Sequence, residues 1–366
     1  MIHRAEIENS GSIRERQVID LRVAATAPDL DRFVRPKGDE GVRLPTVVAF
    51  FGPNASGKTT VLRAIASAIE FAAFSVKLEA GASVPLLQPF RAALWRTRPT
   101  QIQVDFDANW IGDRPHVFRY QLSVAHGAAA GEQRVLHEAL HVRDGRRFRS
   151  LFKRDQQVIR CAQELQLPPS DTRLEAVRPN ASVISTLALL NHGFFRSVVD
   201  DLARTQRNVR GYHAAPDIKL ALSFLDANRE ALDDLTLQLT RLDIGLTNVD
   251  LEQTPYGLAA TFSHEGLDQR VALPEESNGT RSFITNFPGL WFSLKTGRPV
   301  LVDEFDVDLY PRLIPEILNW SRIRRLINIR LSSSLPPTTS RSWRRWKKRR
   351  STSSKSRAMA QAPLLG

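Results

Sequence analysis

The spacing of apolar residues separates a β-rich beginning from segments with helical periodicity. Apolar and polar residues alternate on both sides of residues 9–12, with three aliphatic residues of positions 19–23 on one face, which predicts paired strands. Residues 46–51 form a continuous apolar run, which is typical of a strand buried on both faces of a parallel sheet. Apolar residues then recur at helical spacing over residues 61–69, so the local order is strand, loop and helix.

Two later segments also have a regular pattern. Apolar residues alternate with polar ones on both sides of Gly112, which predicts an antiparallel hairpin; they are Ile102, Val104, Phe106, Phe118, Tyr120, Leu122 and Val124. A leucine-rich stripe over residues 218–242 predicts one long amphipathic helix. We expect it to pack on a core and not in a coiled coil, because no heptad is sustained. Residues 162–211 have a mixed pattern that predicts no element.

The loop after the apolar run has the spacing of a phosphate-binding loop. It matches G-x-x-x-x-G-K-[ST] with Gly52, Pro53, Asn54, Ala55, Ser56, Gly57, Lys58 and Thr59, and Thr60 follows. Glycines there let successive backbone N–H groups turn toward phosphates, and the helix N-terminus adds its positive dipole. We expect Lys58 to contact the β and γ phosphates as a catalytic residue, and Thr59 to ligate Mg²⁺ through its hydroxyl.

A second segment ends in two acids. Residues 299–302 have the pattern of an apolar strand, and Asp303 and Glu304 follow it directly, which is the Walker B pattern. Asp303 is expected to hold Mg²⁺, usually through water, and Glu304 to orient or deprotonate the attacking water. The alternative, surface acids after an edge strand, loses weight once the phosphate-binding loop is present.

A third loop lies about two dozen residues before Asp303 and has the sequence Ser277-Asn278-Gly279. A Ser-x-Gly loop that opens a helix is an anion site, and its size suits a γ-phosphate. The same pattern is also that of a simple helix cap, so the residues alone leave both readings open.

In this order, the three motifs resemble the heads of ATP-binding-cassette-type ATPases. The segments ENSGSIRE, GPNASGKTT, LPEESNGT and LVDEFDVDLYP are similar, more specifically, to AAA-family ATPases of the RecF/OLD-like branch. The resemblance covers residues 1–70 and 270–320, and the middle only by general layout. It implies an α/β P-loop NTPase fold with an ABC-type ATPase head, built from a mixed sheet, an antiparallel β subdomain and an inserted helical region.

The resemblance also implies how the site is completed. In such ATPases the Ser-x-Gly loop, here Ser277 and Gly279, completes the site of the opposite subunit, so ATP joins two heads into a homodimer and hydrolysis releases them. Relatives of this kind are linked to DNA repair or anti-phage defence, which implies DNA or an effector protein as partner. Tyr310 replaces the family's histidine after Walker B, and Pro288-Gly289 is expected to interrupt the helix after the Ser-x-Gly loop.

We expect five parts along the chain. Residues 1–75 form the N-terminal half of the head, 76–160 the antiparallel β subdomain, 161–265 the inserted, largely helical region, 266–320 the half with the Ser-x-Gly loop and Walker B, and 321–366 a basic tail. The chain has 51 Lys and Arg against 39 Asp and Glu, a formal charge of +12, but the tail contains 13 basic residues and no acidic one. The first 320 residues are therefore almost neutral and make no electrostatic case for DNA.

Cysteine content and apolar run lengths limit the cellular setting. The single cysteine, Cys161, excludes an internal disulfide, and no Cys/His cluster has the spacing of a zinc site. The longest apolar runs are shorter than the roughly 20 residues that cross a bilayer, and Glu6 and Glu8 make the N-terminus unlike a secretion signal. We expect a cytoplasmic protein without a membrane segment.

The tail does not continue the family pattern. The family has a further apolar strand that ends in a histidine contacting the γ-phosphate, whereas no histidine follows His264 in this chain. Consider a shifted reading frame in which each new codon joins the third base of one codon to the first two bases of the next. If the serines use TCN codons, this frame converts residues 331–334 into codons for Phe, Leu, Ile or Val. The same shift permits His-Asn at residues 337–339. We hypothesise a single-base deletion near Ser321; the alternative is a genuine basic arm for nucleic acid.

Two functions remain in view. The leading hypothesis is a Mg²⁺-dependent ATPase head that dimerises through ATP. The runner-up is a degenerate, non-hydrolysing nucleotide-binding protein whose basic tail binds nucleic acid. A GTPase is disfavoured because no Asn-Lys-x-Asp motif occurs, and a kinase because no phosphoacceptor site can be identified.

Overall fold

The computed structural model describes most of the chain up to Glu304. The described residues are 1–30, 32–36, 38–39, 41–84, 87–109, 115–127, 133–207, 217–241, 245–304 and 320, together with the backbone of 327–330. The chain divides into two compact units, residues 1–332 and 333–366, and every described residue lies in the first.

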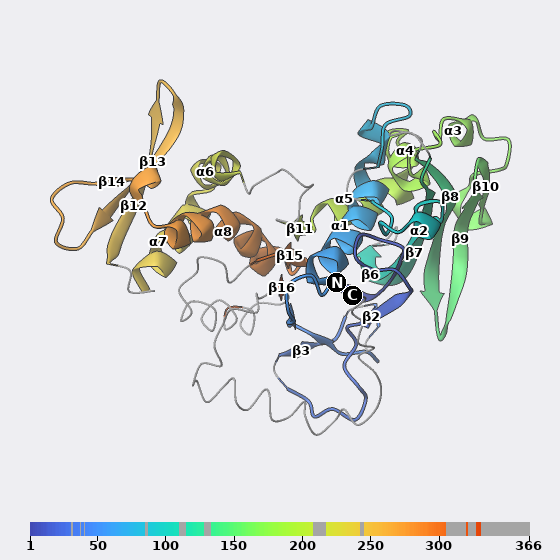
Figure 1. Ribbon diagram of the computed structural model, residues 1–366, viewed down its shortest axis with the longest axis horizontal. Helices are drawn as coiled ribbons and strands as arrows, with labels where there is room; N and C mark the ends of the chain where they lie inside the picture. The colour runs from blue at the N-terminus through green and yellow to red at the C-terminus, as the bar shows by residue number, and fades with distance from the viewer. Residues whose placement is uncertain are drawn as a thin grey trace. The chain divides into compact units, whose positions relative to one another are not determined.

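A seven-stranded antiparallel sheet is the largest element of the fold (Figure 1). Its strands, in spatial order, are β10 (Val158–Cys161), β9 (Arg147–Asp155), β8 (Arg134–Asp144), β7 (Pro115–Ala125), β6 (Thr100–Asn109), β1 (Ile2–Glu8) and β2 (Gln17–Asp20). Strand β1 pairs with β2, from Arg4 opposite Asp20, which confirms the predicted pair of strands and shows that it is antiparallel. Strand β6 pairs with β7, from Thr100 opposite Val124, which confirms the predicted antiparallel hairpin.

The apolar side of this sheet forms the core together with three helices. The helices are α1 (Lys58–Phe74), α4 (Val183–Leu189) and α5 (Gly193–Ala203). Alternation places Val104, Phe118 and Tyr120 on the buried side, each no more than 2% exposed. Short elements connect these helices: η1 (Ser75–Lys77), α2 (Ala93–Arg96), η2 (Gln163–Leu165) and α3 (Thr172–Glu175).

A second sheet is parallel and contains four short strands. Their order is β11 (Gln206–Arg207), β15 (Val300–Val302), β16 (Ile327–Arg330) and β5 (Val47–Phe50). The predicted apolar run is therefore a strand of a parallel sheet, although its residues are half-buried and not fully buried. Strand β16 falls inside the segment that we assigned to the basic tail, and it separates the strands that precede the two predicted phosphate motifs.

The remaining described elements form a helical and β-hairpin group. They are α6 (Ile218–Ala227), α7 (Arg229–Arg241), β12 (Leu246–Thr254), β13 (Gly257–His264), β14 (Val271–Ala272), η3 (Leu273–Glu275) and α8 (Asn278–Thr296). Strands β12, β13 and β14 form an antiparallel sheet, and β3 (Phe33–Val34) pairs with β4 (Leu44–Pro45).

Two sequence predictions are wrong in this region. The predicted single helix is two helices, because the chain leaves helical geometry at Asn228, whose side-chain amide donates to the Phe224 carbonyl at 2.7 Å. Helix α8 runs without interruption through Pro288, so Pro288-Gly289 does not end it. Burial of Phe287 and Leu290 on either side of Pro288 offsets the loss of a backbone hydrogen bond there.

Candidate nucleotide site

The phosphate-binding loop closes around the side chain of Lys58. This side chain begins helix α1, is 5% exposed, and donates from Nζ to the carbonyl oxygens of Gly52 and Pro53, each at 2.7 Å. The hydroxyl oxygen of Ser56 lies 3.4 Å from the same nitrogen. The ammonium is thus held at the centre of the loop, where a bound anion would meet it.

Backbone geometry in the loop requires small residues. Gly57 caps α1 with φ of +87°, and Ala55 also has a positive φ of 64°. A Cβ atom on Gly52 would lie 2.9 Å from the Ser56 hydroxyl, which is too close for an unshifted side chain. Asn54 and Ser56 are exposed, so the loop presents its outer side to solvent within the described structure.

A turn that precedes the loop by forty residues packs against it. Ser12 Oγ lies 2.8 Å from the hydroxyl of Thr60, and a Cβ atom on Gly57 would lie 3.3 Å from Ser12 Oγ. Gly11 also sits close to Thr60, where its φ of +56° and a 3.0 Å approach favour glycine. The sequence predicted a turn here, but no pattern linked it to the phosphate-binding loop.

The sheet brings the two predicted phosphate motifs to one edge. Because β5, β16 and β15 are parallel, their carboxyl ends lie together, and Val302 is aligned with Ala49 through Ile329. Asp303 follows β15, as the phosphate-binding loop follows β5. With strands about 4.8 Å apart, two strand spacings place β5 and β15 roughly 10 Å from each other.

The two acids differ in exposure and conformation. Asp303 is half-buried, and its Oδ1 accepts a hydrogen bond from the Glu304 backbone N–H at 3.1 Å. Glu304 is exposed and has a positive φ of 54°. Thr59 lies in the first turn of α1, so Thr59, Asp303 and Glu304 all belong to the carboxyl edge of the parallel sheet.

The Ser-x-Gly loop lies at the beginning of helix α8. Ser277 caps this helix: its Oγ accepts from the Thr280 N–H at 3.1 Å and lies 2.9 Å from the Thr280 hydroxyl. Asn278 accepts a hydrogen bond from Arg281, and both Ser277 and Asn278 are exposed. Gly279, at the second position of the helix, is half-buried.

Nothing in the sequence indicated several polar contacts that connect helices α5 and α1 to residues in or beside the strands. Asp201 of α5 is 5% exposed, pairs with Arg298 and accepts from the Asn109 N–H at 2.5 Å. Arg207 of β11 lies 3.3 Å from Glu70 of α1. The shortest of these separations is 92 positions, so spacing in the sequence could not indicate them.

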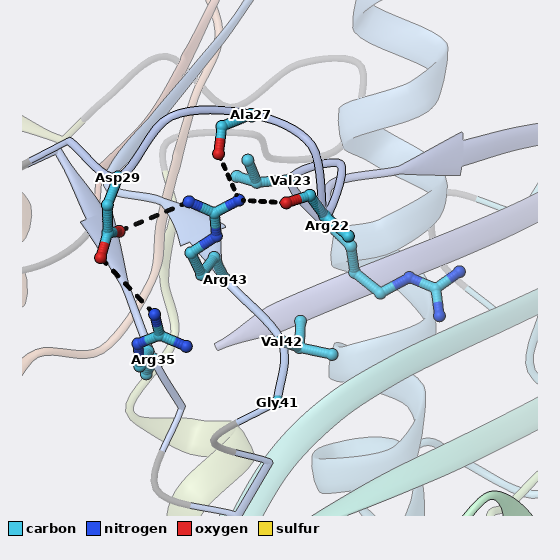
Figure 2. A pocket seen from close by; sticks show the side chains of 9 residues that line it. Arg22, Val23, Ala27, Asp29, Arg35, Gly41, Val42 and Arg43 are labelled. Carbon is cyan, nitrogen blue, oxygen red and sulfur yellow. Dashed lines mark hydrogen bonds and ion pairs between the residues drawn. The ribbon is translucent and has the colours of Figure 1, made fainter.

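A hollow of about 580 Å³ lies over residues 22–43 and contains none of the predicted site residues. In Figure 2, Arg22 points away from Asp29, whereas Arg43 is directed at its own loop: it donates to the Ala27 carbonyl at 2.7 Å and lies 3.4 Å from Asp29. Arg35 also lies 3.5 Å from Asp29. Arg35 and Arg43 hold the loop together and are not arranged around an empty anion site.

One helix passes a length and composition test for a membrane span. In the part of the chain that the structure describes, residues 58–77 are long and apolar enough to cross a bilayer by composition. This segment contains α1, and 61% of its apolar window is buried inside the protein, as in the core helix of a globular domain.

Comparison with known proteins identifies the family. The model of the family described as "AAA domain, putative AbiEii toxin, Type IV TA system" matches residues 47–330. No curated protein matches the chain. Solved structures that are similar include an Smc head bound to the C-winged helix domain of ScpA, at 12% identity and a TM-score of 0.44, covering 91% of this chain and 90% of that one. An Smc head domain with a coiled coil and joint from Pyrococcus yayanosii has 11% identity and a TM-score of 0.42, covering 90% and 92%.

The family match spans both phosphate motifs, the Ser-x-Gly loop and strand β16, which are the parts that build the parallel sheet and its carboxyl edge. The chain therefore belongs to this AAA domain family and has an α/β P-loop NTPase fold.

Proposed function

We propose that this protein is a cytoplasmic, Mg²⁺-dependent ATPase of the RecF/OLD-like branch, which forms a homodimer through ATP. The observation that carries the proposal is the shared edge of the parallel sheet, where the Lys58 loop and the Asp303-Glu304 pair both lie. A buried lysine supplies positive charge for phosphates, and two acids nearby supply a metal ligand and a base.

The residues at this edge fit a nucleotide with its magnesium ion. Mg²⁺ prefers hydroxyl, carboxylate and phosphate oxygens, which are the donors that Thr59 and Asp303 offer. When bound, the ion neutralises charge on the β and γ phosphates. Residues 52–60 bind the phosphates through backbone N–H groups, with Lys58 as the buried counter-charge.

Glu304 is the residue that we assign to the attacking water. Its carboxylate is exposed one residue beyond Asp303, so it can accept a proton from water beside the γ-phosphate. Positive φ at a residue other than glycine or asparagine is strained, and such strain concentrates at functional sites. This supports a catalytic assignment over a surface acid.

Dimerisation through ATP is supported by the exposed Ser-x-Gly loop. Ser277 and Asn278 are solvent-accessible at the N-terminus of the 19-residue helix α8, where backbone N–H groups can receive a phosphate. We propose that Ser277 and Gly279 contact the γ-phosphate held by a second copy of the chain.

The biological role that we propose is DNA repair or anti-phage defence, with DNA or an effector protein as partner. The description of the family names a toxin of a type IV toxin–antitoxin system, and such a system contains a second protein. This description favours a protein partner over DNA, in agreement with the near-neutral charge of residues 1–320.

For the domain layout we keep the proposed boundaries up to residue 320 and move the end of the head to Arg330. Strand β16 ends there, and so does the family match. A deletion near Ser321 does not fit β16, because this strand and the family match both continue to Arg330. We therefore propose that the reading frame shifts beyond Arg330 and that the basic segment after it takes no part in the ATPase.

A complementation experiment tests binding, hydrolysis and dimerisation together. Lys58→Ala and Ser277→Arg should each reduce ATP hydrolysis at least tenfold as single variants. In a mixture, the heterodimer has one site with both defects and one site with neither. We therefore expect the mixture to recover a substantial part of the wild-type rate, measured as phosphate release, while Lys58→Ala alone no longer binds ATP.

Lys219→Ala is the matched control, because Lys219 is an exposed lysine at the start of α6. It should leave both binding and hydrolysis unchanged. Retained ATP binding by Lys58→Ala would contradict the nucleotide site, and a mixture no more active than its components would contradict the shared site. An intact nucleotide site with no hydrolysis in the wild type would favour the degenerate, tail-binding alternative.

A further inference from the structure

The residue before Ser277 is tied to a histidine of another strand. Glu276 Oε1 lies 2.5 Å from Nε2 of His264, the last residue of β13. Both side chains are largely withdrawn from solvent: that of Glu276 is 6% exposed and that of His264 is 19% exposed. The contact joins the Ser-x-Gly loop to the β12–β14 sheet.

The charges around this contact are unfavourable for binding a phosphate. Two carboxylates, Glu275 and Glu276, directly precede a helix N-terminus where we propose that a γ-phosphate docks. Glu275 is exposed, so water screens its charge, whereas the carboxylate of Glu276 is buried and screened less. An unrestrained Glu276 carboxylate would also compete with a phosphate for the backbone N–H groups that open α8.

The histidine removes this competition. Its imidazole donates to Glu276 and holds the carboxylate toward β13, and in the protonated form it also balances the negative charge. Ser277, in turn, keeps its hydroxyl in the helix cap with Thr280. The backbone at Glu276 is extended, with φ of −68° and ψ of 155°, and carries the chain from the 3-10 turn into that cap.

The same sheet anchors both ends of the contact. Strand β14 pairs with β13 through Phe262 and Val271, and it leads directly into η3 and Glu276. Leu273 of η3 is buried, and its carbonyl accepts from the Glu276 N–H at 3.2 Å. The loop therefore has one backbone connection and one side-chain connection to β13.

We infer that His264 is a positioning residue for the Ser-x-Gly loop: it holds Glu276 away so that the loop accepts the terminal phosphate of ATP bound to a second copy of this chain. The inference rests on the proposed function, because it needs ATP to be shared between two copies.

The test measures ATP-dependent dimerisation separately from ATP binding. The full chain is titrated with adenylyl imidodiphosphate and MgCl₂, and dimer formation is followed by analytical ultracentrifugation. We expect His264→Ala to need at least ten times more nucleotide for half-maximal dimerisation, with nucleotide binding per chain within a factor of two of wild type. Combining it with Glu276→Gln should restore dimerisation to within threefold of wild type, because the competing charge is gone.

His137→Ala is the matched control. His137 of β8 pairs with Asp155 of β9 at 2.9 Å. The substitution therefore removes a histidine–carboxylate pair from a different sheet and should not change dimerisation. If Ser277→Arg abolishes dimerisation while His264→Ala behaves as wild type, the inference about His264 is overturned and the shared site stands. If wild type does not dimerise with nucleotide, the proposed function itself fails. Urea unfolding distinguishes a folding defect, which would lower the midpoint of both His264→Ala and the double variant. If the double variant dimerises no better than His264→Ala, the inference is contradicted.

Discussion

At the scale of single residues, Glu304 shows how geometry separates two adjacent acids. Asp303 uses one carboxylate oxygen to accept the Glu304 N–H at 3.1 Å, and Glu304 has a positive φ of 54°. For a residue other than glycine, this conformation costs about 1–2 kcal/mol. The two residues adopt different backbone conformations, since only Glu304 has a positive φ, and this difference supports assigning them different roles.

Replacing Glu304 by Gln is expected to slow ATP hydrolysis by at least a hundredfold and to leave ATP binding within a factor of two. The amide keeps the size of the side chain but cannot accept a proton from water. Phosphate release and equilibrium nucleotide binding measure the two effects separately. Glu265→Gln, at an exposed position after β13, serves as control. Hydrolysis by Glu304→Gln at the wild-type rate would remove Glu304 from the proposed chemistry.

At the scale of elements, a histidine connects the strands of the antiparallel sheet to the first turn of the chain. His126 Nε2 lies 2.7 Å from Thr100 Oγ1, and Thr100 in turn donates to the Asn9 carbonyl at 2.6 Å. The Gln133 amide lies 3.1 Å from His126 Nδ1. Thr100 must therefore accept from Nε2–H and Gln133 must donate to Nδ1, which describes a neutral imidazole.

Stability should consequently fall in mild acid. Burial lowers the pKa of His126 below its ordinary value near 6.5, so the folded state binds fewer protons than the unfolded chain. The stabilisation is complete above about pH 6.5 and is lost as the pH falls toward the folded-state pKa. We expect a lower urea midpoint at pH 5.5 than at pH 7.5, and a smaller difference in His126→Gln.

His141 provides a second case with the same sign, because burial and then Lys153 and Arg119 lower its pKa as well. His141→Gln should therefore also reduce the pH dependence, and the two substitutions together should reduce it further. An unchanged difference between pH 5.5 and pH 7.5 in the double variant would contradict this explanation.

At the scale of the whole molecule, the site depends on one short strand from the far end of the chain. Strand β16 lies between β5 and β15 and pairs in parallel with both, so it sets the separation of the Lys58 loop from Asp303. Its residues follow Walker B by about two dozen positions and precede the most basic part of the sequence. We therefore propose that the boundary between the ATPase and the tail falls close to Arg330.

The nucleotide sequence downstream of the Asp303 codon tests the origin of that tail. We expect the shifted frame to stay open through the codons of residues 331–354 and to encode an apolar strand that ends in histidine. Restoring this frame should increase ATP hydrolysis, because it returns a side chain for the γ-phosphate. A stop codon in the shifted frame within this stretch would contradict the deletion and favour a genuine basic arm.

Single strands, helices and loops of the fold and the site could be predicted from the sequence, because each follows from a pattern of neighbouring residues. Alternation predicted the β1–β2 and β6–β7 pairs, and the apolar run with its glycine loop predicted β5, the phosphate-binding loop and α1. The continuity of two longer helices was predicted wrongly. The helix expected over residues 218–242 is broken at Asn228. Pro288 does not interrupt α8, since burial of Phe287 and Leu290 outweighs the local preference of proline.

What the sequence by itself determined is the identity and order of the phosphate motifs, because each is a short run whose spacing follows from the chemistry of phosphate binding. Only the tertiary structure decided which distant segments meet: Ser12 with Thr60, His264 with Glu276, and β16 between β5 and β15. Such contacts depend on which strand edges pair and which side chains are buried together. The chain contains many other serine–threonine and histidine–glutamate pairs, so residue type alone could not predict which of these pairs come into contact.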